Sequence, residues 1–247
     1  MYLKILLQNK YIYKIGSSAI LIINLIKNIL NIYDDNMYKL MEANMKLQVL
    51  VSCMHQQDYS LLEKMNIQTD AIIINQCDIN KFEDIKYRNN LVKFISLNER
   101  GVGKSRNNAL LRADSDICLF ADEDVSYVDG YEDIIIKAFK KNPDADIILF
   151  NLESTNKQRP IYQITKEKRV RKYNFLKYGT VRIAAKVSSL RKANVHFSLL
   201  FGGGTKYGSG EDSLFLKDCI SRGLKMYTSP EKIGYVSQDS SCWFEGY

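Results

Sequence analysis

The chain has 247 residues, of which 46% are hydrophobic and 26% are charged, as is typical of one globular domain or two closely packed halves. No Pro-rich or Ser/Gly-rich run divides it, no CxxC pair occurs among its five cysteines, and it has only two histidines, so a flexible linker, a zinc site, a disulfide framework and a Ser-His-Asp triad are not indicated. The cysteine pattern predicts a reducing cytosol, and the net charge of +7 favours an anionic partner, whether nucleic acid, acidic lipid or a phosphorylated small molecule.

Residues 1–45 are predicted to form a helical extension. The apolar stretch Ile15–Ile32 follows a lysine-bearing start, but no small-residue cleavage site of a signal peptide comes after it. Its polar residues lie at i, i+3, i+4 and i+7, on one stripe of a helix opposite a wide apolar face, and they are Asn24, Lys27, Asn28 and Asn31. This stripe argues against a membrane-crossing helix, which needs about 20 mostly apolar residues. The helix is expected either to pack on the following domain or to lie in a membrane interface.

From Met45 onward, short apolar runs alternate with polar helical patterns, which is typical of a βαβ sheet covered on both faces. The predicted strands are Leu47–Ser52, Ala71–Asn75, Val92–Leu97 and Ile117–Ala121, and the predicted helices are Tyr59–Asn66 and Lys104–Ala113. Ligands of such sheets bind beyond the carboxyl ends of the strands. The residues expected to converge on one crevice are therefore Ser52–Met54, Asn75–Asp78, Asn98–Lys104 and Asp122–Asp124.

The remaining sequence predicts three strands and one helix around a basic stretch. Strands are expected at Asp146–Leu152, Val181–Val187 and Lys225–Thr228, and a helix is expected at Glu211–Gly223 with Leu214, Phe215, Ile220 and Leu224 on its inner face. Between them, Lys166–Tyr178 carries many basic residues. A solvated face or a membrane-surface patch is the simpler interpretation, and a base-stacking surface for nucleic acid is the alternative.

Three carboxylates directly follow the fourth predicted strand, in Asp122-Glu123-Asp124. Alternation along a strand points Asp122 and Asp124 the same way. Two like charges so close together are unfavourable unless a cation is shared, and Mg²⁺ or Mn²⁺ prefers carboxylate and phosphate oxygens. The motif therefore predicts a site for a metal-bound diphosphate, the alternative being an acidic turn that caps the next helix.

A second acidic pair, Glu211-Asp212, follows a glycine-rich loop, Gly202–Gly210, where a helix is expected to begin. One interpretation is helix capping, because acids in the first turn interact favourably with the helix dipole. The other is a general base presented by a mobile loop. The pair alone does not decide between them.

The segment Gly101-Val-Gly-Lys-Ser105 resembles part of a phosphate-binding P-loop. The full motif requires a glycine where Asn98 stands, so the match fails at its first position. A P-loop nucleotidase and a nucleotidyltransferase remain alternative functions for the acidic crevice, and a non-catalytic nucleic-acid-binding protein is the alternative from another class.

Together these motifs resemble glycosyltransferase family 2, especially its bacterial capsule and cell-envelope polysaccharide members. The resemblance runs from Leu47 to the end of the chain, and three segments carry it: Asn98–Asn108, the DxD motif Asp122–Asp124, and Ser209–Phe215. It implies the GT-A fold, an α/β architecture with a Rossmann-like, mostly parallel central sheet flanked by helices. The catalytic domain would then span residues 46–247, with a nucleotide-binding half at 46–125 and an acceptor-binding half at 126–247.

The resemblance also implies roles for individual residues. Asp124 would be the main ligand of Mn²⁺ or Mg²⁺, with Asp122 on the ribose or the metal's water shell and Glu123 beside them. Asp212 would be the catalytic base, with Glu211 orienting the acceptor or the loop. The other nucleotide-binding residues would be Lys104 and Arg106 near the phosphates, and Ser52, Asn75 and Asp78 around the base, with Asn75 or Asp78 in place of the family's usual aspartate.

The implied function is transfer of a sugar, with inversion, from a nucleotide-diphosphate sugar, with a UDP-sugar as the expected donor, to a saccharide or lipid-linked saccharide. The expected partners are that donor and that acceptor, with peripheral contact at the inner face of the cell membrane and no nucleic acid. Relatives are expected to continue beyond the terminal Trp243–Tyr247 segment.

Overall fold

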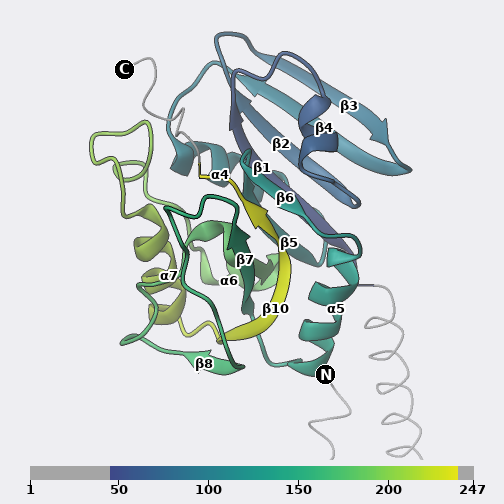
Figure 1. Ribbon diagram of the computed structural model, residues 1–247. Helices are drawn as coiled ribbons and strands as arrows, with labels where there is room; N and C mark the ends of the chain where they lie inside the picture. Colours follow the sequence, from purple (N-terminus) through teal and green to yellow (C-terminus); the bar gives the residue numbers. More distant parts are fainter. Residues whose placement is uncertain (1–44, 239–247) are drawn as a thin grey trace, which may run out of the picture. The chain divides into compact units, whose positions relative to one another are not determined.

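The computed structural model describes residues 45–238, all within the unit Met45–Tyr247 (Figure 1). The predicted N-terminal helix and the terminal Trp243–Tyr247 segment lie outside this range. Among the described residues, no helix has the length and apolar character needed to cross a bilayer.

Four parallel strands form the first half of the sheet, as predicted. They are β1 (Leu47–Met54), β2 (Asp70–Gln76), β4 (Asn90–Leu97) and β5 (Ile117–Asp122), arranged in the order β4-β2-β1-β5. Every residue of β1 is buried, because the strand is covered on both faces and reads as a nearly continuous apolar run. Helices α3 (Ser60–Lys64) and α4 (Val102–Arg112) connect these strands close to their predicted positions.

An edge strand that was not predicted, β3 (Lys81–Tyr87), pairs antiparallel with β4. The turn between them contains only Arg88 and Asn89, with φ values of 47° and 69°. Two positive φ values in a two-residue hairpin turn match the right-handed twist of the strands. Most of the strand's side chains are exposed or half-buried, which suits an edge.

The second half of the sheet is mixed. Antiparallel strand β9 (Ile183–Lys186) lies between β5 and β7 (Ile147–Ser154), and β10 (Met226–Val236) runs parallel to β7. The short strands β6 (Val125–Tyr127) and β8 (Lys168–Val170) pair antiparallel with β10. The complete order is β3-β4-β2-β1-β5-β9-β7-β10-β6, with β8 on β10.

Several boundaries in this half differ from the prediction. The predicted strand Val181–Val187 is a 3₁₀ turn, η2 (Thr180–Arg182), followed by β9 and then by α6 (Val187–Ala193). Strand β10 continues well beyond the predicted Thr228, through irregularities in its pairing with β7. Helix α5 (Tyr131–Lys141) was not predicted. Helix α7 (Glu211–Ser221) was, and Phe215, Ile220 and Leu224 contribute to the core as expected, whereas Leu216 and Cys219 are buried there in place of Leu214.

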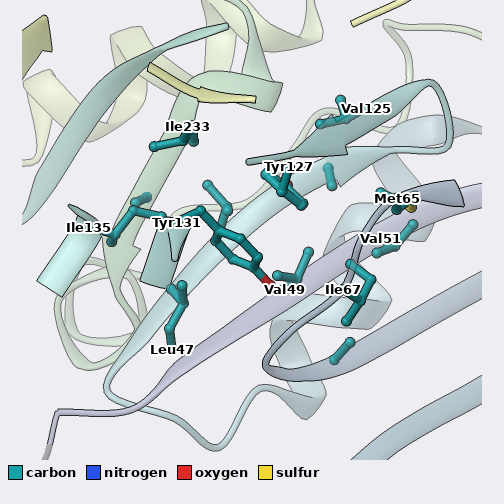
Figure 2. Close-up of a cluster of buried hydrophobic side chains, with 14 of the residues drawn as sticks. Leu47, Val49, Val51, Met65, Ile67, Val125, Tyr127, Tyr131, Ile135 and Ile233 are labelled. Carbon is teal, nitrogen blue, oxygen red and sulfur yellow. The ribbon is translucent and has the colours of Figure 1, made fainter. Parts of the chain in front are cut away.

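Alternating strand residues build two cores, one on each face of the sheet. On one face Val49 and Val51 of β1 join Tyr131 and Ile135 of α5, and Figure 2 shows the Tyr131 ring among these aliphatic side chains. On the other face Leu50 and its neighbours pack against α4, α6 and α7. The helices therefore flank the sheet as a GT-A fold requires, and all parallel strands of the first half end at the same edge.

Candidate active site

The acidic turn Asp122–Asp124 lies at the carboxyl end of β5, where Asp122 is in register with Ser52 of β1. Its three carboxylates have different partners. Asp122 binds Arg106, Glu123 Oε2 accepts hydrogen bonds from Met54 N (3.2 Å) and Gln56 Nε2 (2.9 Å), and Asp124 Oδ2 accepts one from Gln238 N (3.2 Å). Glu123, predicted to bind nucleotide, thus fixes the loop after β1.

Arg106 of α4 is the centre of the site. Its guanidinium, only 4% exposed, donates from Nη2 to Asp122 and from Nη1 to Glu211 and Asp212, each at 3.0 Å. Burial by itself would lower the pKa of Arg106, but the charges of Asp122, Asp212 and Glu211 outweigh it and raise that pKa. Arg106 is therefore a permanent cation shared by the two acidic motifs, and its place near the donor phosphates stays a prediction.

Glu211 is held at the start of α7 by the glycine-rich loop. Gly202 has a φ of +104°, and a Cβ at this position would come within 2.8 Å of Glu211 Cδ. Only a glycine leaves room for the Glu211 carboxylate between the loop and Arg106. The side chain of Glu211 is 12% exposed, so it serves the internal ion cluster.

Asp212 is the more accessible acid of the pair, with 31% of its side chain exposed. Its Oδ1 accepts hydrogen bonds from Arg106 Nη1 and from the hydroxyl of Thr180 in η2. Its Oδ2 faces Gly179, where a Cβ would lie 3.4 Å away. Two donors thus fix one oxygen, and the absence of a side chain at Gly179 leaves space beside the other.

Burial raises the pKa of Asp122 and of Glu211, and in Glu211 the neighbouring Asp212 charge raises it further. Burial and the Asp122 charge raise the pKa of Asp124 to about 6. Asp124 has no bond to Arg106 among the contacts of the described residues, so the negative charge at this turn exceeds what Arg106 compensates. Its hard oxygen donors fit a divalent cation.

No group of three His, Cys, Asp or Glu side chains within residues 45–238 is arranged as a complete metal site. A cation at Asp124 and Asp122 would therefore need further ligands from a bound phosphate, as Mg²⁺ commonly does.

A cavity of about 380 Å³ lies beside the acidic turn, at the ends of β2 and β4. Its volume is within the usual range for small-molecule sites. Asn75, Asp78, Phe94 and Ser96 are among its lining residues. Gln56 connects the two regions, since its backbone N donates to Asn75 Oδ1 (2.9 Å) while its side chain donates to Glu123.

The predicted base-pocket residues differ in their accessibility. Ser52 is fully buried, accepts a hydrogen bond from Ser105 Oγ (2.8 Å) and does not line the cavity. The amide of Asn75 is engaged by the backbone of Gln56 and by Ser96. Asp78 is 80% exposed and pairs with Arg100, which makes it the better placed of the two candidates for an external ligand.

Lys104 lies away from the acidic cluster, in a separate hollow with Leu110 and Leu190. The glycines before it have structural roles, because a Cβ at Gly103 would come within 2.1 Å of the Ser198 carbonyl oxygen. Close packing of α4 against this carbonyl oxygen explains why residue 103 is a glycine, so a bound phosphate is not needed to explain it. The sequence did not identify Thr180 or Gln56, whose contacts join positions far apart in the chain.

Comparison with solved structures shows what the fold is similar to. Two solved structures of S. aureus TarS residues 1–349 share the fold, one with a TM-score of 0.58 at 19% identity, covering 78% of this chain and 60% of that chain. The other, in complex with UDP-GlcNAc, has a TM-score of 0.60 at 19% identity and covers 82% and 62%. The chain thus spans about three fifths of these two TarS chains. None of the curated proteins matches it in sequence.

The sheet order, the acidic turn at the end of β5 and these structural matches define the fold as GT-A. The model of glycosyl transferase family 2 matches residues 59–196, more than half of the chain. The chain belongs to glycosyl transferase family 2.

Proposed function

We propose that the protein transfers a sugar, with inversion, from a UDP-sugar to the hydroxyl group of a saccharide or lipid-linked saccharide. The observation that carries this proposal is the convergence of two acidic motifs on one buried cation, with Asp212 the more exposed acid of its pair. Family membership supports the reaction class.

The cavity beside Asn75 and Asp78 would hold the nucleoside of the donor. Phe94, which lines this cavity, provides an aromatic wall together with Tyr59, whose ring centroid lies 5.2 Å away. S. aureus TarS, which shares this fold, has been solved in complex with UDP-GlcNAc and with UDP. This supports a UDP-sugar as the first donor to test.

Asp124 and Asp122 would hold Mn²⁺ or Mg²⁺ together with the diphosphate of the donor. Such a cation would supply compensation for the charge that develops on the leaving nucleotide. The raised pKa of Asp124 supports this assignment, because a carboxylate that is hard to ionise alone is stabilised by a nearby cation.

Asp212 would accept the proton of the attacking hydroxyl. Arg106 and Thr180 both bind Oδ1, so Oδ2, facing Gly179, is the oxygen placed to accept it. The hydroxyl oxygen then bonds to the anomeric carbon as the bond to the nucleotide diphosphate breaks. A single displacement of this kind inverts the configuration and needs no covalent intermediate.

The acceptor would be a growing bacterial surface polysaccharide, such as a capsule or cell-envelope polymer, extended in the cytoplasm at the inner face of the membrane. The net charge of +7 supports peripheral attachment there.

Thermal unfolding with UDP, GDP, CMP and dTDP sugars, each with and without Mn²⁺, tests the donor proposal. A ligand that binds only the folded protein raises its apparent stability, by about 2.7 kcal/mol at one hundred times its Kd. We expect the largest increase with a UDP-sugar plus Mn²⁺. Release of pyrophosphate instead of UDP during turnover would identify a nucleotidyltransferase and contradict the proposal.

A further inference from the structure

The basic stretch noted in the sequence has no task in the proposed reaction. Its central part, residues 169–177, is called the basic loop here. It begins within β8 and leads to η2, and Figure 1 shows β8 near the end of α7. Val170 and Phe175 are buried in the core that contains α7, and Arg171 N donates to Asn174 Oδ1 (2.8 Å). These contacts fix the loop, so its exposed side chains are presented in a defined arrangement.

Two large side chains of the basic loop point into solvent. Tyr173 is 77% exposed and Leu176 is 73% exposed. A single exposed apolar residue is ordinary on a protein surface. Here a tyrosine and a leucine occur together among cations, which is the composition of surfaces that enter the membrane–water interface.

The basic loop and the residues just before it carry a strongly positive net charge. Residues 166–177 contain six basic residues and one acid, a net charge of +5 compared with +7 for the whole chain. The acid, Glu167, is paired with Lys141 at 2.8 Å. Arg169, Arg171 and Lys172 take part in none of the ion pairs formed within the described residues.

These three cations surround a hollow of about 270 Å³ beside the end of α7. Tyr173 and Leu224 also line it, and no carboxylate does. The last carbonyls of α7 are capped within the chain, for example by Gly223 N donating to Ile220 O (3.1 Å). The lining of the hollow therefore offers cationic donors to a phosphate group, and Asp144, which interacts electrostatically with Arg169, is not part of that lining.

We infer that the basic loop docks on an anionic lipid bilayer, with a lipid phosphate in this hollow and with Tyr173 and Leu176 in the interface. Attachment would thus be a property of the catalytic domain itself, and it does not depend on the identity of the donor or on catalysis. Thr180, which binds Asp212, follows Lys177 by three positions, so docking would bring the membrane surface close to the acceptor side of the site.

Leu176 favours a bilayer over nucleic acid as the partner. Nucleic-acid surfaces without sequence preference use aromatic rings on which bases stack, and a leucine has no such face. A bilayer gains affinity from apolar and basic residues together.

Co-sedimentation of the full chain with vesicles tests the inference. We expect binding to vesicles of phosphatidylcholine with phosphatidylglycerol, and little binding to phosphatidylcholine alone. The variant Arg169→Gln, Arg171→Gln, Lys172→Gln should bind the anionic vesicles roughly a hundredfold more weakly, because each basic residue near an anionic surface contributes on the order of fivefold. The matched control is Lys86→Gln, Lys137→Gln, Lys140→Gln, which removes the same charge from other exposed positions and should bind within about threefold of the wild type.

A second variant, Tyr173→Ser with Leu176→Ser, keeps every charge. It should weaken vesicle binding by about tenfold and leave binding to a labelled RNA unchanged. Equal vesicle binding by the wild type and the triple glutamine variant would overturn the inference. A second pair of results would also overturn it: RNA binding that is lost in the triple variant, and vesicle binding that is unchanged by Tyr173→Ser with Leu176→Ser. The partner would then be a soluble polyanion.

Discussion

Asp122 and Asp212 bind the same guanidinium group of Arg106, yet they are positioned by different means. Asp122 is the last residue of a central strand, where the sheet itself sets its place next to Ser52. Asp212 lies in the first turn of a helix that follows the glycine-rich loop, and its Oδ1 is held by the side chains of Arg106 and Thr180. The position of Asp122 should therefore persist when a neighbouring side chain is removed, whereas the position of Asp212 should change.

The strand-end acids can be tested first, because the largest effect is expected there. Asp124→Ala should abolish transfer and Mn²⁺-dependent UDP binding while the fold persists. Removing a carboxylate from a crowded acidic turn relieves repulsion in the metal-free protein. Calorimetric titration with UDP, with and without Mn²⁺, measures this, and unchanged metal-dependent binding would exclude Asp124 as a ligand.

Removing the cation shared by both acids should strongly destabilise the fold. Arg106→Met leaves three partly buried carboxylates without compensation, and breaking a buried ion pair in this way costs about 3–5 kcal/mol. Urea unfolding gives the free energy directly. The control is Lys141→Met, which breaks the exposed pair with Glu167 and should cost about 0–1 kcal/mol. Equal losses in the two variants would contradict the central role of Arg106.

The pH dependence of stability tests the charge excess at Asp124. Burial raises its pKa from 3.8 to about 6, so the folded state favours the protonated acid. Its contribution is fully present below about pH 4 and is lost as the pH rises through about 6, which amounts to about 3 kcal/mol in metal-free buffer. Asp124→Asn should reduce this decline in the free energy of unfolding, and an identical decline would show that other groups cause it.

Removing the hydrogen bond from Thr180 to Asp212 should have a smaller effect, and this effect should be confined to turnover. Thr180→Val removes one hydrogen bond to Oδ1 and should lower kcat by about tenfold with the KM for donor unchanged. Thr180→Ser keeps the hydroxyl and should retain most of the activity. A change in donor KM alone would place Thr180 with the nucleotide instead.

The sequence was most informative where structure depends on local residues. Strands β1, β2, β4 and β5 were predicted because strands buried on both faces are continuous apolar runs. The acids after β5 followed from the same pattern. Strand β3 lacks such a run, and its hairpin uses positive φ at Arg88 and Asn89, where the more usual signal is glycine.

The arrangement of the site could be predicted only in part, because it depends on contacts between distant residues. Arg106 meets Glu211 across 105 positions, and Thr180 meets Asp212 across 32. No local pattern indicates that Arg106 turns toward the acids while Lys104, two residues away on the same helix, faces another hollow. No local pattern indicates that Ser52 is buried and hydrogen-bonded to Ser105.

The catalytic role of Asp212 is tested most directly by Asp212→Asn, measured as UDP release with a competent acceptor beside the affinity for the UDP-sugar. Asparagine keeps the size of the side chain and much of its hydrogen bonding but removes the proton acceptor. Donor affinity should hold while turnover falls by about 10²–10⁴-fold, the usual contribution of a general base. Near-normal turnover would show that Asp212 only accepts the hydrogen bonds of Arg106 and Thr180 in the first turn of α7, and would shift the role of base to Glu211.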